Sequence, residues 1–102
     1  MTNTMINTVD VSLLLTFCKQ HTIQKMWLFG SVLRDDFTPD SDIDILVEFQ
    51  PDHIPSWEFF TWEDELATLL GYPVDLMTPD SLRPWLKDTI MNGARLIYDA
   101  QG

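Results

Sequence analysis

The sequence predicts a small α/β (α+β) domain in which helices pack on a mixed β-sheet of about four strands. Apolar residues at helical spacing alternate along the chain with short runs of branched and aromatic residues, which are typical of strands. Glycine and proline separate these segments, and 102 residues are enough for one hydrophobic core. We therefore expect a single domain over residues 1–102, in which the polar start, residues 1–8, is loosely ordered.

The first half of the chain predicts one helix and two strands. Apolar residues at helical spacing predict a helix over about residues 10–20, with Asp10 or Ser12 as its cap. Residues 23–30 predict a strand that ends at a glycine, where a sharp turn is allowed. Residues 43–49 predict the next strand, and the connection between the two strands is long enough for one helical turn.

A second helix is predicted over residues 56–70, with Ser56 as its cap and Gly71 at its end. The start of this helix is unusually aromatic. At helical spacing we expect two of its four aromatic side chains to pack inward and two to be exposed, which would mark a surface for a partner protein. The four are Trp57, Phe59, Phe60 and Trp62.

The chain then predicts a strand, a helix and a closing strand. The strand lies within residues 72–78, and the helix follows over about residues 79–93, where Pro84 allows only a bent or a late start. Residues 94–99 predict a short edge strand. Two large side chains of this last helix are assigned to the core, Trp85 and Met91.

The net charge of the chain argues against some classes of binding partner and favours others. Six basic residues stand against sixteen acidic ones, which gives a net charge of −10. Nucleic-acid binders usually carry the opposite sign because they neutralise phosphates, so we expect no direct binding of nucleic acid. The imbalance suits a chain that holds divalent cations or docks on a basic protein, and solubility alone is the alternative explanation.

The single cysteine, the lack of a signal-peptide pattern and the lack of a long apolar run predict a cytoplasmic protein that does not enter a membrane. Cys18 cannot form an intramolecular disulfide, and its place in an apolar helical pattern assigns it to the core. His21 and His53 have no partner at metal-ligand spacing, so we expect both to face solvent.

A glycine–serine pair and three acids form the pattern that indicates chemistry. Gly30-Ser31 ends the first strand, and after ten intervening residues Asp42-Ile43-Asp44 opens the next. Acids at alternate strand positions project from one face, where their repulsion destabilises the fold unless a cation or hydrogen-bond donors compensate it. Asp75 joins them if its strand lies next to theirs, and three carboxylates suit two Mg²⁺ ions. Since N–H groups at a turn into a helix bind phosphate, the pattern predicts phosphoryl or nucleotidyl transfer.

Other interpretations of these acids are possible. Asp40, Asp42 and Asp44 have the spacing of a calcium loop, but its sixth and twelfth positions hold isoleucine and proline instead of glycine and glutamate. The calcium interpretation is therefore rejected. Asp42 as a cap of its strand, and Asp75 as a single acid at a strand edge, stay open as alternatives.

The same residues resemble the signature of a known superfamily. Gly30-Ser31, Asp42-Ile43-Asp44 and a later Asp75 look like the motif of the DNA polymerase beta-like nucleotidyltransferases, and the length resembles their minimal nucleotidyltransferase (MNT) branch. The resemblance spans residues 27–97 and implies the polymerase beta-like nucleotidyltransferase fold. It implies that Gly30 and Ser31 bind nucleotide phosphates. It also implies that Asp42, Asp44 and Asp75 are the catalytic acids and bind magnesium.

Two positions depart from the pattern of this superfamily. Its members commonly carry an arginine directly after the serine and a glycine five positions after the motif glycine, where this chain has Val32 and Asp35. Arg34 matches a frequent arginine of the superfamily. The resemblance therefore implies that Arg34 is the cation that contacts the nucleotide.

Superfamily members of this size are similar to the MntA-type antitoxins of HEPN/MNT toxin–antitoxin pairs. The resemblance implies an Mg²⁺-dependent enzyme, with ATP as substrate, that transfers AMP to a tyrosine hydroxyl of a helical HEPN ribonuclease toxin within a hetero-oligomer. Asp75 is then also a candidate base toward that hydroxyl. Two alternatives stay open, an antitoxin that occludes its toxin without catalysis and an enzyme that modifies a small molecule.

Overall fold

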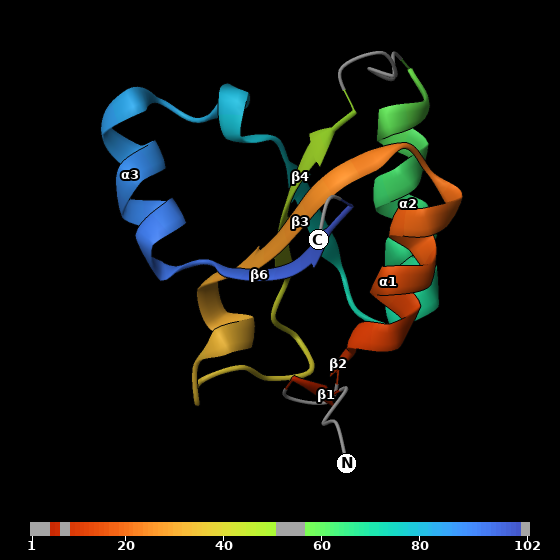
Figure 1. Ribbon diagram of the computed structural model, residues 1–102. Coiled ribbons are helices and arrows are strands. Elements are labelled where there is room, and N and C mark those ends of the chain that lie inside the picture. Colours follow the sequence, from red (N-terminus) through yellow and green to blue (C-terminus); the bar gives the residue numbers. More distant parts are fainter. Residues whose placement is uncertain (1–4, 7–8, 51–56, 101–102) are drawn as a thin grey trace.

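Four strands form one mixed sheet in the computed structural model, which describes residues 5–6, 9–50 and 57–100 (Figure 1). The strand order is β5-β4-β3-β6; β4 and β5 are parallel, and the other two neighbouring pairs are antiparallel. The strands are β3 (Ile23–Phe29), β4 (Ile43–Phe49), β5 (Val74–Met77) and β6 (Arg95–Asp99). The predicted mixed sheet is confirmed, and β6 lies at its edge as expected.

Two helices, α1 (Val11–Gln20) and α2 (Glu58–Leu70), lie side by side on one face of the sheet (Figure 1). α1 begins after Asp10, whose carboxylate accepts a hydrogen bond from Ser12 N at 3.0 Å, so the predicted cap is confirmed. α2 ends at Gly71 as predicted, and this glycine has a φ of 78° in the left-handed region.

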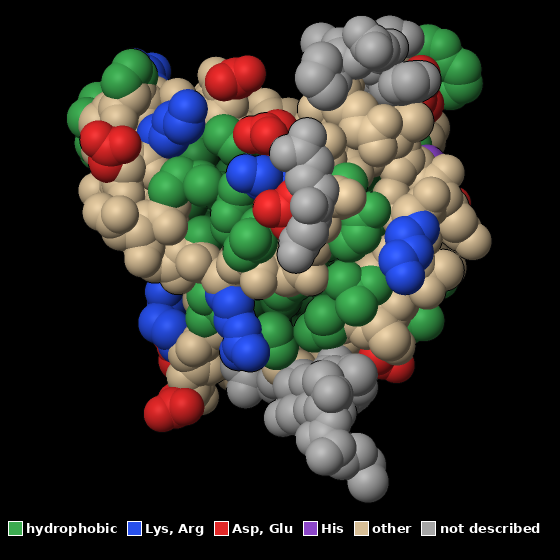
Figure 2. Space-filling model, viewed as in Figure 1, with side chains coloured by type: hydrophobic (Ala, Val, Ile, Leu, Met, Phe, Trp, Pro, Cys, Tyr) green, Lys and Arg blue, Asp and Glu red, His purple; other side chains and the backbone are tan. Residues whose placement is uncertain are grey.

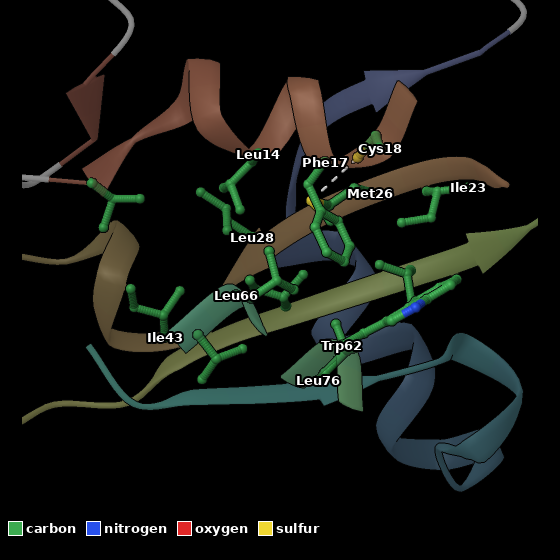
Figure 3. Packing of buried hydrophobic residues seen from close by; sticks show 14 of the residues in the cluster. Leu14, Phe17, Cys18, Ile23, Met26, Leu28, Ile43, Trp62, Leu66 and Leu76 are labelled. Carbon is green, nitrogen blue, oxygen red and sulfur yellow. Dashed lines mark hydrogen bonds between the residues drawn. The ribbon is translucent and has the colours of Figure 1, made fainter. Parts of the chain in front are cut away.

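The hydrophobic core lies between these two helices and the sheet (Figure 3). Alternate strand residues point into it, because successive side chains of a strand project from opposite faces. Its buried members include Leu14, Phe17, Cys18, Met26, Leu28, Ile43, Ile45, Val47, Trp62 and Leu66. Cys18 thus belongs to the core as predicted, with its Sγ 3.6 Å from Met26 Sδ. Burial raises the pKa of this thiol to about 12.

α3 (Pro84–Gly93) starts late, as one of the two predicted outcomes, because a separate 3-10 turn (Pro79–Ser81) precedes it. The helix has no buried residue and lies apart from α1 and α2 (Figure 1). The assignment of Trp85 to the core is wrong, since this residue is 71% exposed. α3 makes few contacts with the rest of the described chain, so its first turn has little to pack against. Met91 is half-buried.

The aromatic start of α2 divides as predicted. Phe59 and Trp62 pack inward, whereas Trp57 and Phe60 are exposed. Phe59 packs edge-on against Phe49 of β4, with 5.7 Å between ring centroids. The outward pair stays available on the surface of α2.

His21 does not face solvent as predicted. Its ring centroid lies 4.2 Å from that of Phe17 and 4.7 Å from that of Trp62. Its Nε2 lies 3.2 Å from a carboxylate oxygen of Glu65. α1 ends just before this histidine and α2 runs alongside, so the ring fills the junction of the two helices. The other histidine, His53, and the predicted cap, Ser56, lie outside the described residues.

A short two-stranded sheet precedes α1 and was not predicted. β1 (Met5–Ile6) pairs in antiparallel fashion with β2 (Val9–Asp10). Two residues are too few to show the alternation by which a strand is found in a sequence. Val9 is buried, so this ribbon adds to the core.

The described helices have 10, 13 and 10 residues. None of them is both long and apolar enough to cross a membrane.

Candidate functional site

The glycine–serine pair lies in a tight turn at the end of β3. Residues Gly30–Leu33 form a single 3-10 turn, and Gly30 has a φ of 79°. Arg34 N donates a hydrogen bond to Ser31 O at 2.9 Å and closes the turn. Val32 is fully buried, so the residue that replaces the common arginine packs in the core and brings no charge to the surface of the turn. The short helical turn predicted between the two strands is confirmed.

Two of the three predicted acids lie side by side on neighbouring strands. Asp44 of β4 and Asp75 of β5 are partners in the parallel register, and Asp44 is also the partner of Phe29 on β3. A Cβ placed on Gly30 would overlap Oδ2 of Asp44, so the carboxylate lies against the backbone of the glycine. The structure therefore brings together Gly30, Asp44 and Asp75, which are far apart in the sequence.

Asp42 lies one residue before β4 and is exposed. Burial raises the pKa of Asp44, and the charges of Asp75 and Asp42 raise it further, while Arg34 opposes them. Burial also raises the pKa of Asp75, with the charges of Glu63 and Asp42 adding to the effect. The three acids are therefore close enough for their charges to repel one another.

Arg34 contributes a positive charge to the site. Its side chain is exposed, and its Nε lies 3.2 Å from Asp36 Oδ1. Because its charge counteracts the repulsion at Asp44, the guanidinium lies within electrostatic range of the acids. Asp35, the other departure from the common pattern, is exposed beside it.

Glu63 of α2 is a neighbour of the site that the sequence motif did not indicate. One of its carboxylate oxygens accepts a hydrogen bond at 3.0 Å from the backbone N–H of Leu76, the residue after Asp75. β5 is an edge strand, so this N–H on its outer side has no strand partner. The sequence predicts only that Glu63 lies on a helix. Its contact with Leu76 depends on how α2 packs on β5, which no local pattern indicates.

The donor set at this site is suited to magnesium. The acids supply hard oxygen ligands, and their mutual repulsion is the kind that a divalent cation relieves. Among the described residues, no group of three or more acidic, histidine or cysteine side chains is arranged to hold a metal ion by itself. The arrangement fits an open Mg²⁺ site, because this ion keeps several waters and commonly takes one or two carboxylates together with substrate phosphates.

A recess opens beside the glycine–serine turn, on the side of α3. Its volume is about 440 Å³, and it is lined by Phe29, Gly30, Leu33, Arg34, Thr89, Ile90 and Gly93. Figure 2 shows hydrophobic side chains in the hollow between α3 and the strands. The contribution of α3 was not predicted, since its lining residues match no motif and only the packing of the helix places them here. The recess has the size of a small-molecule site and adjoins the turn.

The family model of the nucleotidyltransferase domain matches residues 11–97, which include the turn and all three acids. The chain belongs to this family. The nucleotidyltransferase is 40% identical over 75 residues to a candidate protein adenylyltransferase of Methanocaldococcus jannaschii, MJ0128, covering 71% of this chain and 74% of that one. It is 39% identical over 70 residues to protein adenylyltransferase MntA of Thermococcus cleftensis, covering 68% and 69% of the two chains.

Solved structures with a similar fold come from toxin–antitoxin complexes. A crystal structure of a toxin–antitoxin complex with AMP-PNP contains a chain with a TM-score of 0.74 and 23% identity, covering 88% of this nucleotidyltransferase and 73% of that chain. A tri-AMPylated Shewanella oneidensis HEPN toxin in complex with its MNT antitoxin gives a TM-score of 0.58 at 26% identity, covering 78% and 60%. The minimal nucleotidyltransferase fold implied by the sequence is confirmed.

Proposed function

We propose that this nucleotidyltransferase is an antitoxin that transfers AMP from ATP to a tyrosine hydroxyl of a cognate HEPN ribonuclease toxin. The observation that carries the proposal is the contact between the turn and the acids: the Asp44 carboxylate lies against Gly30 and beside Asp75. A phosphate held at the turn would then lie beside the carboxylates, close enough for a bound cation to contact both. The name of the Thermococcus relative and the AMPylated toxin of the Shewanella complex support the acceptor class.

The turn and its arginine would position the nucleotide. Gly30 gives the turn its left-handed φ and leaves room for the Asp44 carboxylate, and Ser31 would offer its hydroxyl and its N–H to a phosphate. Arg34 would neutralise phosphate charge at the mouth of the recess. The recess toward α3 then has room for the sugar and base of ATP.

Asp42, Asp44 and Asp75 would hold the Mg²⁺ ions of this site. When bound, magnesium offsets the charge that develops on the phosphate oxygens during transfer. The acids themselves would keep the ions next to the turn, because Asp44 lies on β4, Asp42 directly precedes this strand, and the register with β5 places Asp75 alongside.

The proposed reaction moves AMP from ATP to the tyrosine oxygen and releases pyrophosphate. The tyrosine oxygen bonds to the α-phosphorus of ATP, the bond between that phosphorus and the bridging oxygen to the β-phosphate breaks, and pyrophosphate leaves with the electron pair. We assign the hydroxyl proton to the carboxylate of Asp75. The raised pKa of this group favours proton acceptance, and the residue is exposed, so an incoming hydroxyl has access to it.

Transfer of labelled AMP to the purified toxin tests the proposal. Asp42→Ala and Asp44→Ala are expected to lower the rate by about 10³-fold or more while the domain stays folded, because each removes a carboxylate that would hold the Mg²⁺ ions. Asp88→Ala, which removes an exposed acid of α3, is the matched control and should transfer at the wild-type rate. A wild-type protein that transfers nothing to the toxin in Mg²⁺ and ATP would sink the enzymatic claim.

Occlusion of the toxin without catalysis is the second candidate function. The exposed aromatic pair of α2 favours it, because such a pair binds a protein without any need for a metal or a nucleotide. The combined Asp42→Ala and Asp44→Ala variant separates the two functions. If it still neutralises the toxin in the absence of ATP, occlusion is sufficient; if neutralisation is lost, transfer is required.

A further inference from the structure

We propose that the outer face of the first two turns of α2 is the docking site for the toxin, and that the docking element of the toxin is a basic surface with an apolar pocket. This inference rests on the proposed function, because it takes the toxin to be the partner. The docking face consists of Trp57, Phe60 and Asp64, and we call it the α2 ridge. None of the three residues belongs to the site, where the contact of α2 is made by Glu63, so docking and chemistry involve different residues.

The α2 ridge exposes two large aromatic side chains next to each other. Trp57 is 72% exposed and Phe60 is 76% exposed, at positions one helical turn apart. Asp64 follows one turn later on the same side of the helix and is also exposed. Figure 2 shows hydrophobic side chains at this end of α2. Exposed aromatic residues of this kind are the side chains that most often dominate the affinity of protein interfaces.

The α2 ridge is held in place by buried aromatic residues beneath it. The ring centroid of Phe60 lies 6.2 Å from that of Phe59, which packs on Phe49 and on the buried Trp62 at 5.7 and 6.4 Å. Trp62 in turn packs against Phe17 of α1. The backbone of the ridge is therefore fixed before a partner arrives, which lowers the entropic cost of binding.

Charge decides which occupant this face fits. The helix that carries the ridge, α2, has four acidic residues and no lysine or arginine. A second copy of the chain would bring the same negative charge to the face and be repelled, as would a nucleic acid. A protein with a basic surface is attracted, and the acids around the aromatic pair would steer its approach.

The position of the α2 ridge explains how docking can leave the site free. Phe59 packs on Phe49, the last residue of β4, whereas Asp44 is near the start of that strand. The opposite end of α2 leads through Gly71 into β5 and Asp75. Between the two ends, Glu63 in the middle of α2 contacts the backbone of β5 beside Asp75. A toxin seated on the ridge would therefore extend along α2 to bring its tyrosine to the acids.

The test measures the affinity of the chain for its purified cognate toxin and the kinetics of AMP transfer to it. The double variant Trp57→Ala, Phe60→Ala is expected to weaken the dissociation constant by about thirty-fold or more. It should raise the KM for the toxin and leave the rate at saturating toxin unchanged. Trp85→Ala is the matched control, because this tryptophan is 71% exposed but lies on α3. The affinity of this variant for the toxin should equal that of the wild type.

A charge variant tests the attraction separately. Asp64→Lys is expected to slow association with the toxin and to reduce the dependence of the association rate on salt, whereas Asp88→Lys on α3 should change neither as strongly. Both variants replace an exposed charged residue by another charged residue, so both should fold, and a change in association rate can be assigned to charge.

Three results would overturn the inference. The first is a Trp57→Ala, Phe60→Ala variant that binds the toxin as tightly as the wild type. The second is a wild-type chain whose α2 ridge joins two copies of the chain, so that the double variant turns a dimer into a monomer without weakening the toxin complex. The third is a wild-type chain that binds no toxin at all, which removes the proposed function as well; the first two results leave that function standing.

Discussion

Gly30 meets two separate demands. Its φ of 79° is in the left-handed region, where a side chain is strained, and a Cβ there would overlap Oδ2 of Asp44. Gly71 has nearly the same φ, 78°, but a Cβ on it would have nothing within 4 Å. The two glycines therefore differ in their surroundings while sharing a backbone conformation.

Gly30→Ala and Gly71→Ala thus form a matched pair. We expect Gly71→Ala to lower the free energy of unfolding by about 1 kcal/mol, through backbone strain alone, and to leave AMP transfer intact. Gly30→Ala should lower it further and reduce transfer strongly, because Asp44 must move away from the turn. Thermal unfolding and labelled transfer measure the two effects. A Gly30→Ala protein that transfers at the wild-type rate contradicts this account of the turn.

The raised pKa of Asp44 predicts that its charged form destabilises the protein when no metal is bound. Its pKa is raised from the ordinary value of 3.8, so the folded protein binds this proton more tightly than the unfolded chain does. The free energy of unfolding therefore falls as the pH rises from about 4 through the raised pKa, and the loss is complete above it. A neutral side chain at position 44 avoids this pH-dependent loss in the free energy of unfolding.

Asp44→Asn is accordingly expected to raise the Tm at pH 7 in EDTA by a few degrees, and the gain should shrink as the pH is lowered toward 4. Adding Mg²⁺ should stabilise the wild type more than the variant, because the ion relieves the same repulsion. Thermal unfolding across this pH range, with Asp88→Asn as an exposed control, measures both effects. A variant that melts below the wild type at pH 7 in EDTA is incompatible with the interpretation.

Elements meet at the site through one parallel pair of strands. β4 and β5 are joined by α2, and their register sets Asp44 opposite Asp75. A shift of one residue in this register would turn Asp75 to the other face of the sheet and expose Val74 and Leu76, which are buried. The hydrophobic core therefore maintains the alignment of the acids.

Glu63 fastens α2 to β5 at this point. Glu63→Ala is expected to lower the free energy of unfolding by about 1–3 kcal/mol, because the part-buried N–H of Leu76 loses its acceptor. Glu63→Gln keeps an acceptor oxygen and should cost less, while removing a charge that raises the pKa of Asp75. Chemical denaturation and hydrogen exchange of the Leu76 amide measure the contact. An amide that exchanges no faster in Glu63→Ala would refute its role.

Across the domain, the elements that sequence reasoning predicted well depend on local signals. The cap of α1 at Asp10, the end of α2 at Gly71 and the strands around the glycine–serine pair all follow from residues a few positions apart. The sequence predicts that Asp75 lies close to Asp44 only if their strands are neighbours, because no local pattern indicates that β4 pairs with β5. The roles of Gly30, Ser31, Arg34 and Asp42 stay predictions from the resemblance of the motif to a known superfamily.

The errors concern packing between elements. Trp85 was assigned to the core because it is large and apolar, but α3 has no buried residue and leaves it on the surface. His21 was assigned to solvent because it is polar, but the junction of α1 and α2 encloses its ring. Glu63 and the lining of the recess by α3 were missed for the same reason: their surroundings are set by elements remote in the chain.

Because Cys18 is the single cysteine of the sequence, the rate at which its thiol is labelled reports how often the core opens. It is buried in the core, and its pKa of about 12 leaves almost no thiolate at neutral pH, so a thiol reagent has nothing to attack while the fold is closed. Once the core opens, the same group regains the reactivity of an ordinary cysteine. Labelling of this single atom therefore counts opening events of the whole core, and a ligand that closes the domain more firmly lengthens the interval between them.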